Sequence, residues 1–472
     1  MIGKIKVGTR ARRGAALAAV TLLFAASAAP ASAQQMRSGL LRDTEIEELL
    51  NAYSQPIFKA AGLGSQQVAV RIINNEAFNA FVMDGRSVFM HSGALMIAKT
   101  PNEVIGVLAH EAGHIEGGHM ASLRIRIAQD KSRMLLAQIL GIGAMIGGAV
   151  AGGDGGREAM AAGQGVMAGG GELVMRALTA ERRSQESAAD QAGLKYLNAT
   201  QQSGQGMLTT FERFANQEMF ISGADQNAFA RTHPVARDRL ARLRQLVEAS
   251  PYFGAKDSPQ LQARHDMMRA KLSGYLEAPG VVFKRYPQSD ASVPARYARA
   301  IAQFRSGGQG SLEAGVALID QLIQEQPNNP YFWEVKGDFY QRAGRAQEAV
   351  QALRKSLQVA GNGPTLIKTQ LAAALLQTKQ PGVVDEAINL LKETLRRDED
   401  DCRAYNALGE AFYAKGLQSK ADLARAQRLM CFGDFKMAKD FAKRAQAGLK
   451  PNSPDWMAAD DIITQKPPKT DG

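Results

Sequence analysis

Cysteine is scarce in this sequence: Cys402 and Cys431 are the only two among its 472 residues. Their spacing excludes a CxxC motif, and with it a CxxC zinc site or a redox-active dithiol. The pair could form a disulfide if the chain is exported to an oxidising compartment. Since the sequence does not place the two Cβ atoms, the bonded and the unbonded state both stay open.

Nucleic-acid motifs are also missing, and basic residues cluster only near the start. The formal net charge is +11, and five of these charges come from residues 4–13. They precede an apolar run that ends in Ala31-Ser32-Ala33, so residues 1–33 are a predicted signal peptide, cleaved before Gln34. Its removal leaves a charge of about +6, and we expect no nucleic-acid partner. No cysteine follows the cut, which argues against a lipoprotein anchor; an uncleaved membrane anchor is the alternative.

A second apolar run, LLAQILGIGAMIGGAVAGG, covers residues 135–153. Its glycines and Gln138 argue against a membrane-spanning helix, which needs about 20 predominantly apolar residues. We interpret it as a hairpin that is buried or makes peripheral contact with a membrane. The glycines and alanines that continue to Gly171 predict a mobile loop near the functional site.

The length of the chain excludes a single ordinary core, so we expect several domains. Residues 34–249 mix strand and helix signals: 68–73 and 80–90 are predicted strands, with a hairpin turn at Asp84-Gly85, and helices follow from Asn102. Residues 250–294, with several Pro and Gly around a helix at 260–276, predict a linker. Helical pairs fill 295–450, and 451–472 are a partly disordered tail.

The helical pairs have the spacing of tetratricopeptide repeats, which are helix-turn-helix units of 34 residues. Residues 333–359 carry one such unit, with Gly337 at a predicted helix crossing, and "YNALGEAFYAKG" at 405–416 repeats its first helix. We interpret "MAKDFAKRA", from Met437, as the second helix of that repeat, displaced by an insertion, and 387–395 as another second helix. An unrelated helical bundle is the alternative.

The segment "VLAHEAGHIEGGH", residues 107–119, holds three of the six histidines of the chain. On a helix, His110 and His114 lie four positions apart on one face, so both imidazoles can bind one metal ion. Glu111 projects beside that ion, where a carboxylate can take the proton of an activated water and return it to a leaving amine. The HExxH pattern therefore predicts metal-dependent peptide hydrolysis.

A catalytic zinc needs a third protein ligand and an open fourth position. The metzincin pattern is excluded, because Met120 stands where its third histidine belongs and His119 is one position off. A glutamate on a separate helix is the other option. Glu186 fits, since Asp190 one turn later can hold the far N–H of a histidine ligand. Glu181 is the rival, with no acidic residue four positions after it.

These motifs, followed by Thr232-His233-Pro234 and Arg239, resemble those of the gluzincin peptidases related to HtpX and the CAAX prenyl proteases. The resemblance implies a mainly α fold: a zincin-type α+β metallopeptidase domain with a small sheet, followed by an α-helical tetratricopeptide-repeat solenoid. It implies one Zn2+ per chain, held by His110, His114 and Glu186. Exported members with such repeats act on outer-membrane assembly in the periplasm, where the repeats dock clients or the assembly machinery.

His233 precedes Pro234, which places it on a loop before a new helix, within reach of a cleft. It could donate to the oxyanion of the tetrahedral intermediate, with Arg239 holding the loop or sharing that charge. Its ring could instead occupy the fourth zinc position and keep the site closed. We prefer the second role, which the resemblance favours. A helix-capping segment with an exposed imidazole is the third possibility.

We expect two further histidines to be structural. His265 lies in the predicted linker helix, and His91 lies in "SVFMHSGAL" just before the HExxH segment. That stretch predicts a strand along the cleft, whose unpaired edge could hold an extended peptide by main-chain hydrogen bonds.

The leading functional hypothesis is a periplasmic zinc endopeptidase that degrades misfolded or stalled envelope and outer-membrane proteins. The alternative is a chaperone or assembly factor for outer-membrane proteins, in which the repeats do the main work and the peptidase is latent. A zinc hydrolase of a non-peptide bond is a third hypothesis, which HExxH with a distant glutamate disfavours.

Overall fold

The computed structural model describes residues 39–64, 68–83, 85–123, 125–126, 153–218, 233, 237–361 and 363–466. The expected signal peptide, its cleavage point and most of the apolar run at 135–153 lie outside these residues. Among the described helices, none combines the length and the apolar character that crossing a membrane requires.

A small mixed sheet opens the fold. Its strands are β1 (Leu40–Leu41), β2 (Ala69–Ile73), β3 (Ala80–Val82) and β4 (Ser87–His91), in the order β1-β2-β4-β3. β3 and β4 form the predicted antiparallel hairpin, in which Phe81 pairs with Phe89, and Gly85 in its turn has a φ of +74°. The strands predicted at 68–73 and 80–90 are therefore confirmed.

The predicted edge position of "SVFMHSGAL" is wrong. β4 lies between β2, to which it is parallel, and β3, so both of its edges are already paired. In the described sheet β3 is an edge strand, and it is the strand that contacts the HExxH helix. The sequence could not reveal this, because the parallel pairing of β2 with β4 depends on a crossover between segments 14 residues apart or more.

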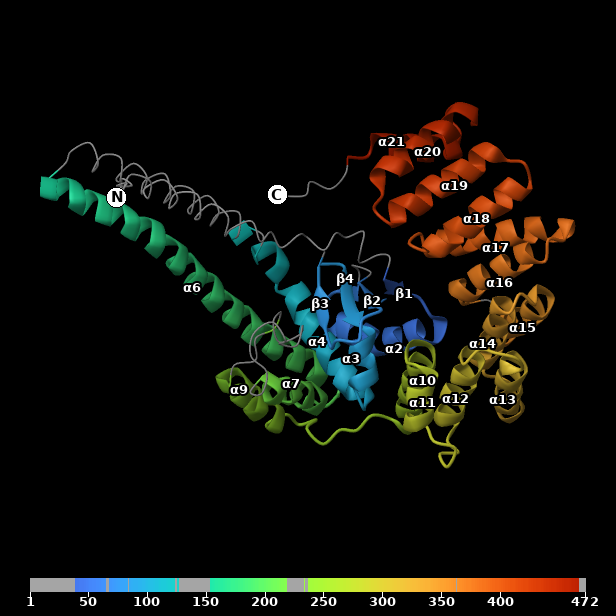
Figure 1. The fold of residues 1–472 in the computed structure, drawn as a ribbon. Helices are drawn as coiled ribbons and strands as arrows, with labels where there is room; N and C mark the ends of the chain where they lie inside the picture. Colours follow the sequence, from blue (N-terminus) through green and yellow to red (C-terminus); the bar gives the residue numbers. More distant parts are fainter. Residues whose placement is uncertain are drawn as a thin grey trace, which may run out of the picture.

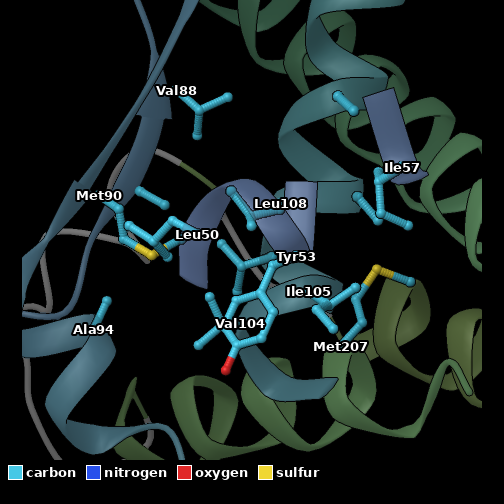
Figure 2. Packing of buried hydrophobic residues seen from close by; sticks show 14 of the residues in the cluster. Leu50, Tyr53, Ile57, Val88, Met90, Ala94, Val104, Ile105, Leu108 and Met207 are labelled. Atoms are coloured by element: carbon cyan, nitrogen blue, oxygen red, sulfur yellow. The ribbon is translucent and has the colours of Figure 1, made fainter. Parts of the chain in front are cut away.

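The helices described in the first part of the chain include α2 (Thr44–Ala60), α3 (Ser92–Ile97), α4 (Pro101–Glu116), α6 (Gly153–Ala199), α7 (Gln205–Glu218) and α9 (Arg237–Glu248). α4 runs through the middle of the core and packs against α2, α6 and α7. Val104, Ile105 and Leu108 of α4 lie in the same apolar cluster as Tyr53 of α2 and Met207 of α7 (Figure 2). This burial fixes the orientation of the helix that carries His110 and His114.

The mobile loop predicted up to Gly171 is wrong for residues 153–171, which form the first turns of α6. This helix is 47 residues long and extends away from the rest of the fold (Figure 1). Glycines disfavour a helix but do not exclude one. Each costs about 1 kcal/mol relative to alanine, but the alanines, the methionines and Glu158 between them favour a helix, and the segment contains no proline.

The second part of the chain is an array of antiparallel helix pairs (Figure 1). The confirmed pairs include α14 (Pro330–Arg342) with α15 (Ala346–Ala360), where a Cβ on Gly337 would lie 2.6 Å from Leu353 Cγ. This glycine lets the two helices approach as predicted. The remaining helices are α12 (Val293–Arg305), α13 (Ser311–Glu325), α16 (Thr365–Gln377), α17 (Val384–Arg397), α18 (Cys402–Ala414), α19 (Gln418–Cys431), α20 (Phe435–Gly448) and α21 (Pro454–Thr464), with a 3-10 turn η3 (Pro381–Val383).

Two assignments within this array need correction. "MAKDFAKRA" is not the second helix of the repeat at 405–416, because α19 pairs with α18 and this segment belongs to α20, which opens the next pair. The array also continues past residue 450, since α21 packs against α19 and α20 within the part predicted as a tail. Residues after 466 are outside the described chain.

The segment predicted as a linker is a buried joint between the two parts. It holds α10 (Pro259–Leu276), as predicted, and α11 (Pro279–Arg285). Met268 and Leu272 of α10 belong to the peptidase-side core, whereas Ala270 belongs to the core of the first repeats. One helix therefore contributes side chains to both cores.

Candidate metal centre

The helix that carries the HExxH motif has well-defined ends. Thr100 caps its N-terminus by accepting a hydrogen bond from the backbone N–H of Glu103, and Pro101 occupies the first turn, where no N–H partner is needed. Glu103 is fixed in turn by an ion pair with Arg213 at 2.6 Å. The helix ends at Gly117, and Gly118 turns the chain with a φ of +60°. These signals set the rotation at which His110 and His114 face inward.

Small residues bring α6 close to α4. A Cβ added to Gly113 would lie 2.8 Å from the carbonyl oxygen of Ala189, and one on Gly193 would lie 3.1 Å from the backbone of Ala109. The helix backbones thus touch directly at the two glycines. This close packing places Glu186 and Asp190, one turn apart on α6, beside the two histidines of α4.

Four side chains gather around one point: His110, His114, Glu186 and His233, all buried. The Nε2 atom of His110 lies 3.1 Å from Nε2 of His114 and 3.3 Å from Nδ1 of His233. The Glu186 carboxylate lies 3.4 Å from each of the first two nitrogens and 3.1 Å from the third. These distances are five of the six edges of a small tetrahedron with the carboxylate as one corner, and the sixth edge, between His114 and His233, is no longer than 4.8 Å.

The tetrahedron has the size that a metal ion such as zinc requires. Zinc–nitrogen bonds of about 2.0–2.1 Å place tetrahedral ligand atoms about 3.3–3.4 Å apart. Neither carboxylate oxygen of buried Glu111 has a hydrogen-bond partner in the described chain. A buried carboxylate without partners is costly, and a site that takes up a water and a cation beside it would satisfy it. The residues present therefore fit a metal ion.

Asp190 and Arg239 support the ligands from the side away from the cluster. Asp190 Oδ1 lies 3.0 Å from Nδ1 of His110, which leaves Nε2 facing the cluster as expected for a carboxylate–histidine pair. Arg239 binds both oxygens of Asp190, at 2.6 and 2.7 Å, and also contacts Glu186 at 2.9 Å. Its guanidinium lies 5.1 Å from the centre of the Phe211 ring. Arg239 thus holds the carboxylates in place.

His233 reaches the cluster from outside the helices that form it. Its Nε2 lies 3.2 Å from the carbonyl oxygen of Ala80 on β3 and 3.4 Å from Oε1 of Glu111. Only this residue is described between 218 and 237. His233 therefore lies beside the cluster, where the sequence predicted it within reach of a cleft. Its ring occupies the fourth corner of the tetrahedron.

Burial and the neighbouring charges shift the pKa values of the buried groups in different directions. Burial alone would lower the pKa of His110, but hydrogen bonds to Asp190 and Glu186 raise it to about 9. Burial and the neighbouring His110 hold the pKa of His114 well below its usual range. Burial would raise the pKa of Glu186, yet His233 and His110 hold it well below its usual range. Burial raises the pKa of Glu111.

The other candidates lie away from the cluster. Glu181 accepts a hydrogen bond from Gln185 and is not a member of the group. His91 is buried against the carbonyl of Ala77, at 3.2 Å, and His265 is held between Tyr53 and the carbonyl of Ala98, as expected of structural residues.

His119 has a role that the sequence reasoning missed. Its Nδ1 lies 2.9 Å from Nδ1 of His114, on the side of that ring that faces away from the cluster. The sequence raised His119 only as a possible metal ligand. It is not one of the four residues that gather around the metal position. Its spacing of five residues from His114 was the available signal, but only the turn at Gly118 makes the two rings meet.

A buried HExxH helix, a glutamate supplied by a second helix and a small mixed sheet define a metallopeptidase of the gluzincin type. Residues 41–247 match the model of Peptidase family M48. The match ends within α9, before the joint formed by α10.

Full-length relatives extend the similarity into the helix pairs. The Beta-barrel assembly-enhancing protease of Yersinia pestis is 22% identical over 437 residues, which cover 92% of this chain and 86% of that protein. The protein of the same name from Escherichia coli K12 is 23% identical over 442 residues, 90% of this chain and 84% of its own length. Metalloprotease LoiP of Escherichia coli K12 is 29% identical over 188 residues, 40% of this chain and 66% of its own.

Proposed function

We propose that this protein is a zinc endopeptidase of the periplasm that cleaves misfolded or stalled envelope and outer-membrane proteins. The observation that carries the proposal is the tetrahedron of ligand atoms beside buried Glu111, whose carboxylate accepts no hydrogen bond in the described chain. The expected signal peptide and the names of the long relatives support the compartment and the class of client. The helix pairs would bind these clients or the outer-membrane assembly machinery, and the run at 135–153, outside the described residues, would provide any peripheral membrane contact.

His110, His114 and Glu186 would hold one Zn2+ per chain, a donor set typical of catalytic zinc. When bound, zinc supplies Lewis acidity toward a water molecule and a peptide carbonyl. Glu111 accepts the proton of the attacking water and returns it to the leaving amine. Asp190 fixes the tautomer of His110, and Arg239 holds Asp190 and Glu186.

Glu111→Gln tests the catalytic assignment. We expect the variant to keep about one zinc per chain, since the ligands remain, and to lose several orders of magnitude in cleavage of an unfolded model protein. Zinc content by elemental analysis and the release of new amino termini are the readouts. Loss of zinc would mean that Glu111 is misassigned, and zinc binding without new amino termini in the native chain would point to a bond other than the peptide bond.

His233 would be an inhibitory fourth ligand. Its Nδ1 lies 3.3 Å from His110 Nε2 and 3.1 Å from Glu186, so it takes the position that a substrate water needs. We expect His233→Ala to raise basal cleavage of an unfolded protein without changing zinc content. Reduced cleavage would support the oxyanion role instead, and unchanged cleavage would leave His233 with neither role.

The position of His233 also favours the second candidate function, a chaperone or assembly factor with a latent peptidase. A closed site leaves the helix pairs as the active part of the resting protein. We expect the Glu111→Gln variant to distinguish the two: if it suppresses aggregation of an unfolded outer-membrane protein as well as the native chain does, binding is independent of cleavage.

A further inference from the structure

The two histidines of the HExxH motif are supported differently on the side away from the cluster. His110 faces the carboxylate of Asp190, whereas the corresponding nitrogen of His114 faces the imidazole of His119. The rings of His114 and His119 are nearly perpendicular, at 79°, with centres 5.0 Å apart. Their two Nδ1 atoms, 2.9 Å apart, are at hydrogen-bond distance.

The chain is shaped to allow this contact. Gly118 takes the left-handed φ of +60° in the turn that follows α4. The ring of His119 then folds back over Gly117, where an added Cβ would lie only 2.4 Å from Nε2 of His119. The absence of a side chain at Gly117 leaves the space that the ring fills, so Nδ1 faces His114 and Nε2 faces the end of the helix.

We propose that His119 is a positioning residue of the metal centre, which accepts the Nδ1 proton of His114 and thereby fixes Nε2 of that ring toward the metal. The proposal rests on the proposed zinc site. A histidine that binds a metal through Nε2 carries its proton on Nδ1, and a partner for that proton sets both the tautomer and the ring orientation. Asp190 does this for His110, and His119 is the group in place to do it for His114.

An imidazole suits this second position better than a carboxylate would. Glu111, Glu186 and Asp190 already bring three acidic groups within the site, with Arg239 as the cation paired to two of them. A further carboxylate on His114 would add another buried negative charge, which is costly without a cation of its own. An imidazole nitrogen accepts the same hydrogen bond without adding charge.

Three substitutions of His119 separate hydrogen bonding from packing. Asn places a polar atom close to the position of Nδ1, Gln places one close to Nε2, and Phe fills the ring space with no polar atom. We expect His119→Phe and His119→Gln to weaken zinc binding about 10–100-fold, measured by competition with a chelator on the full chain, and His119→Asn to restore most of that loss. The melting temperature of the zinc-free protein should stay the same in all three.

Gly117→Ala reaches the same contact without changing His119. Its backbone φ of −69° accepts alanine, and the atom it would meet is the far end of the His119 side chain, so we expect normal folding with a displaced ring and weaker zinc binding. Gly254→Ala, where an added Cβ would meet no atom within 4 Å, is the matched control and should bind zinc as the native chain does.

The outcomes distinguish the two levels of the proposal. If the native chain binds zinc and His119→Phe binds it equally tightly, the role of His119 is overturned and the zinc site is not. The role is also overturned if Asn, Gln and Phe all weaken zinc binding equally and lower the melting temperature of the zinc-free protein. His119 would then contribute packing only. A native chain that binds no zinc overturns the proposed function together with this inference.

Discussion

At the scale of single residues, the candidate site depends on groups that bind no substrate. Arg239 makes three short contacts with the carboxylates of Asp190 and Glu186 and is itself buried. Burial would raise the pKa of Asp190, yet hydrogen bonds from Arg239 and His110 hold it below its usual value. The arginine therefore keeps both carboxylates charged in a place where water cannot stabilise them.

Replacing Arg239 with methionine tests this role. The change leaves two buried carboxylates without their cation, so we expect zinc affinity to fall about 10–100-fold and the protein to lose about 3–5 kcal/mol of stability. Zinc competition and denaturant unfolding measure the two effects. Arg244→Met on the same helix is the control, because Arg244 is exposed and water screens its ion pair with Glu212. Equal effects of the two substitutions would contradict the assignment.

A second residue-scale feature lies at the joint between the two parts of the chain. Lys271 of α10 is buried and contacts Asp43 at 2.8 Å and Glu45 and Glu334 at 3.3 Å each. The three acids come from both sides of the joint, since Glu334 lies on α14. Burial raises the pKa of Glu334 to about 7, although Lys271 opposes the change.

This raised pKa predicts how stability depends on pH. Between the usual value near 4.5 and about 7, the folded protein holds a proton on Glu334 that the unfolded chain has already released. The contribution of Glu334 to stability is therefore complete below the lower value and is lost as pH rises through about 7. We expect the free energy of unfolding of the native chain to fall between pH 5 and pH 8 relative to Glu334→Gln, measured by denaturant titration. A constant difference between the two would show that Glu334 does not titrate in this range.

At the scale of secondary-structure elements, the distance between α4 and α6 decides whether a site exists. The HExxH helix alone supplies two ligands, and the third arrives only because glycines allow the two backbones to touch. Sequence patterns found both helices but could not find their separation. A single added methyl group at the crossing is thus a direct test of how α6 contributes to the site.

Gly113→Ala places that methyl group 2.8 Å from the carbonyl oxygen of Ala189, which is backbone and cannot rotate away. We expect α6 to shift, zinc affinity to fall and stability to decrease by about 1–3 kcal/mol. The matched control is Gly280→Ala, because Gly280 lies in α11 with no atom within 4 Å of an added Cβ. Unchanged zinc binding in Gly113→Ala would show that the helix packing tolerates more than the geometry implies.

At the scale of the whole molecule, the peptidase part and the helix pairs are joined at several points. Besides the cluster around Lys271, Arg42, which follows β1, pairs with Asp398, and Arg71 of β2 pairs with Asp400, and both acids lie between α17 and α18. The apolar core of the first repeats includes Ala270 of α10 and Val282 of α11. The helix array therefore begins before residue 295.

A fragment of residues 250–466 should fold as a helical unit, and a chelator should leave its circular dichroism unchanged, because the metal ligands lie outside it. The shorter fragment 295–450 lacks α10, α11 and α21, so we expect a lower melting temperature for it. Equal stability of the two fragments would contradict the assignment of α10 and α11 to the repeat core.

The region around Cys402 and Cys431 shows where sequence reasoning stops. The sequence left a disulfide open, and the structure contains both residues as thiols whose sulfur atoms lie 3.5 and 4.0 Å from the same carbonyl oxygen of Asp400. No spacing rule could place these two residues near one atom, because they lie at the start of α18 and the end of α19.

The sequence alone determined the features that local periodicity controls. The four-residue interval of His110 and His114 follows from the pitch of one helix, Glu186 and Asp190 follow the same rule on another, and the helix pairs and the β3–β4 hairpin carry their own turn signals. Tertiary structure decided everything that depends on how separate segments meet. It brings Glu186 rather than Glu181 to the histidines, carries His233 to the fourth corner, folds His119 behind His114, and pairs both edges of β4. Those outcomes depend on how closely two backbones approach each other at glycines and on cores that helices distant in the sequence form together. A short stretch of sequence carries no information on either.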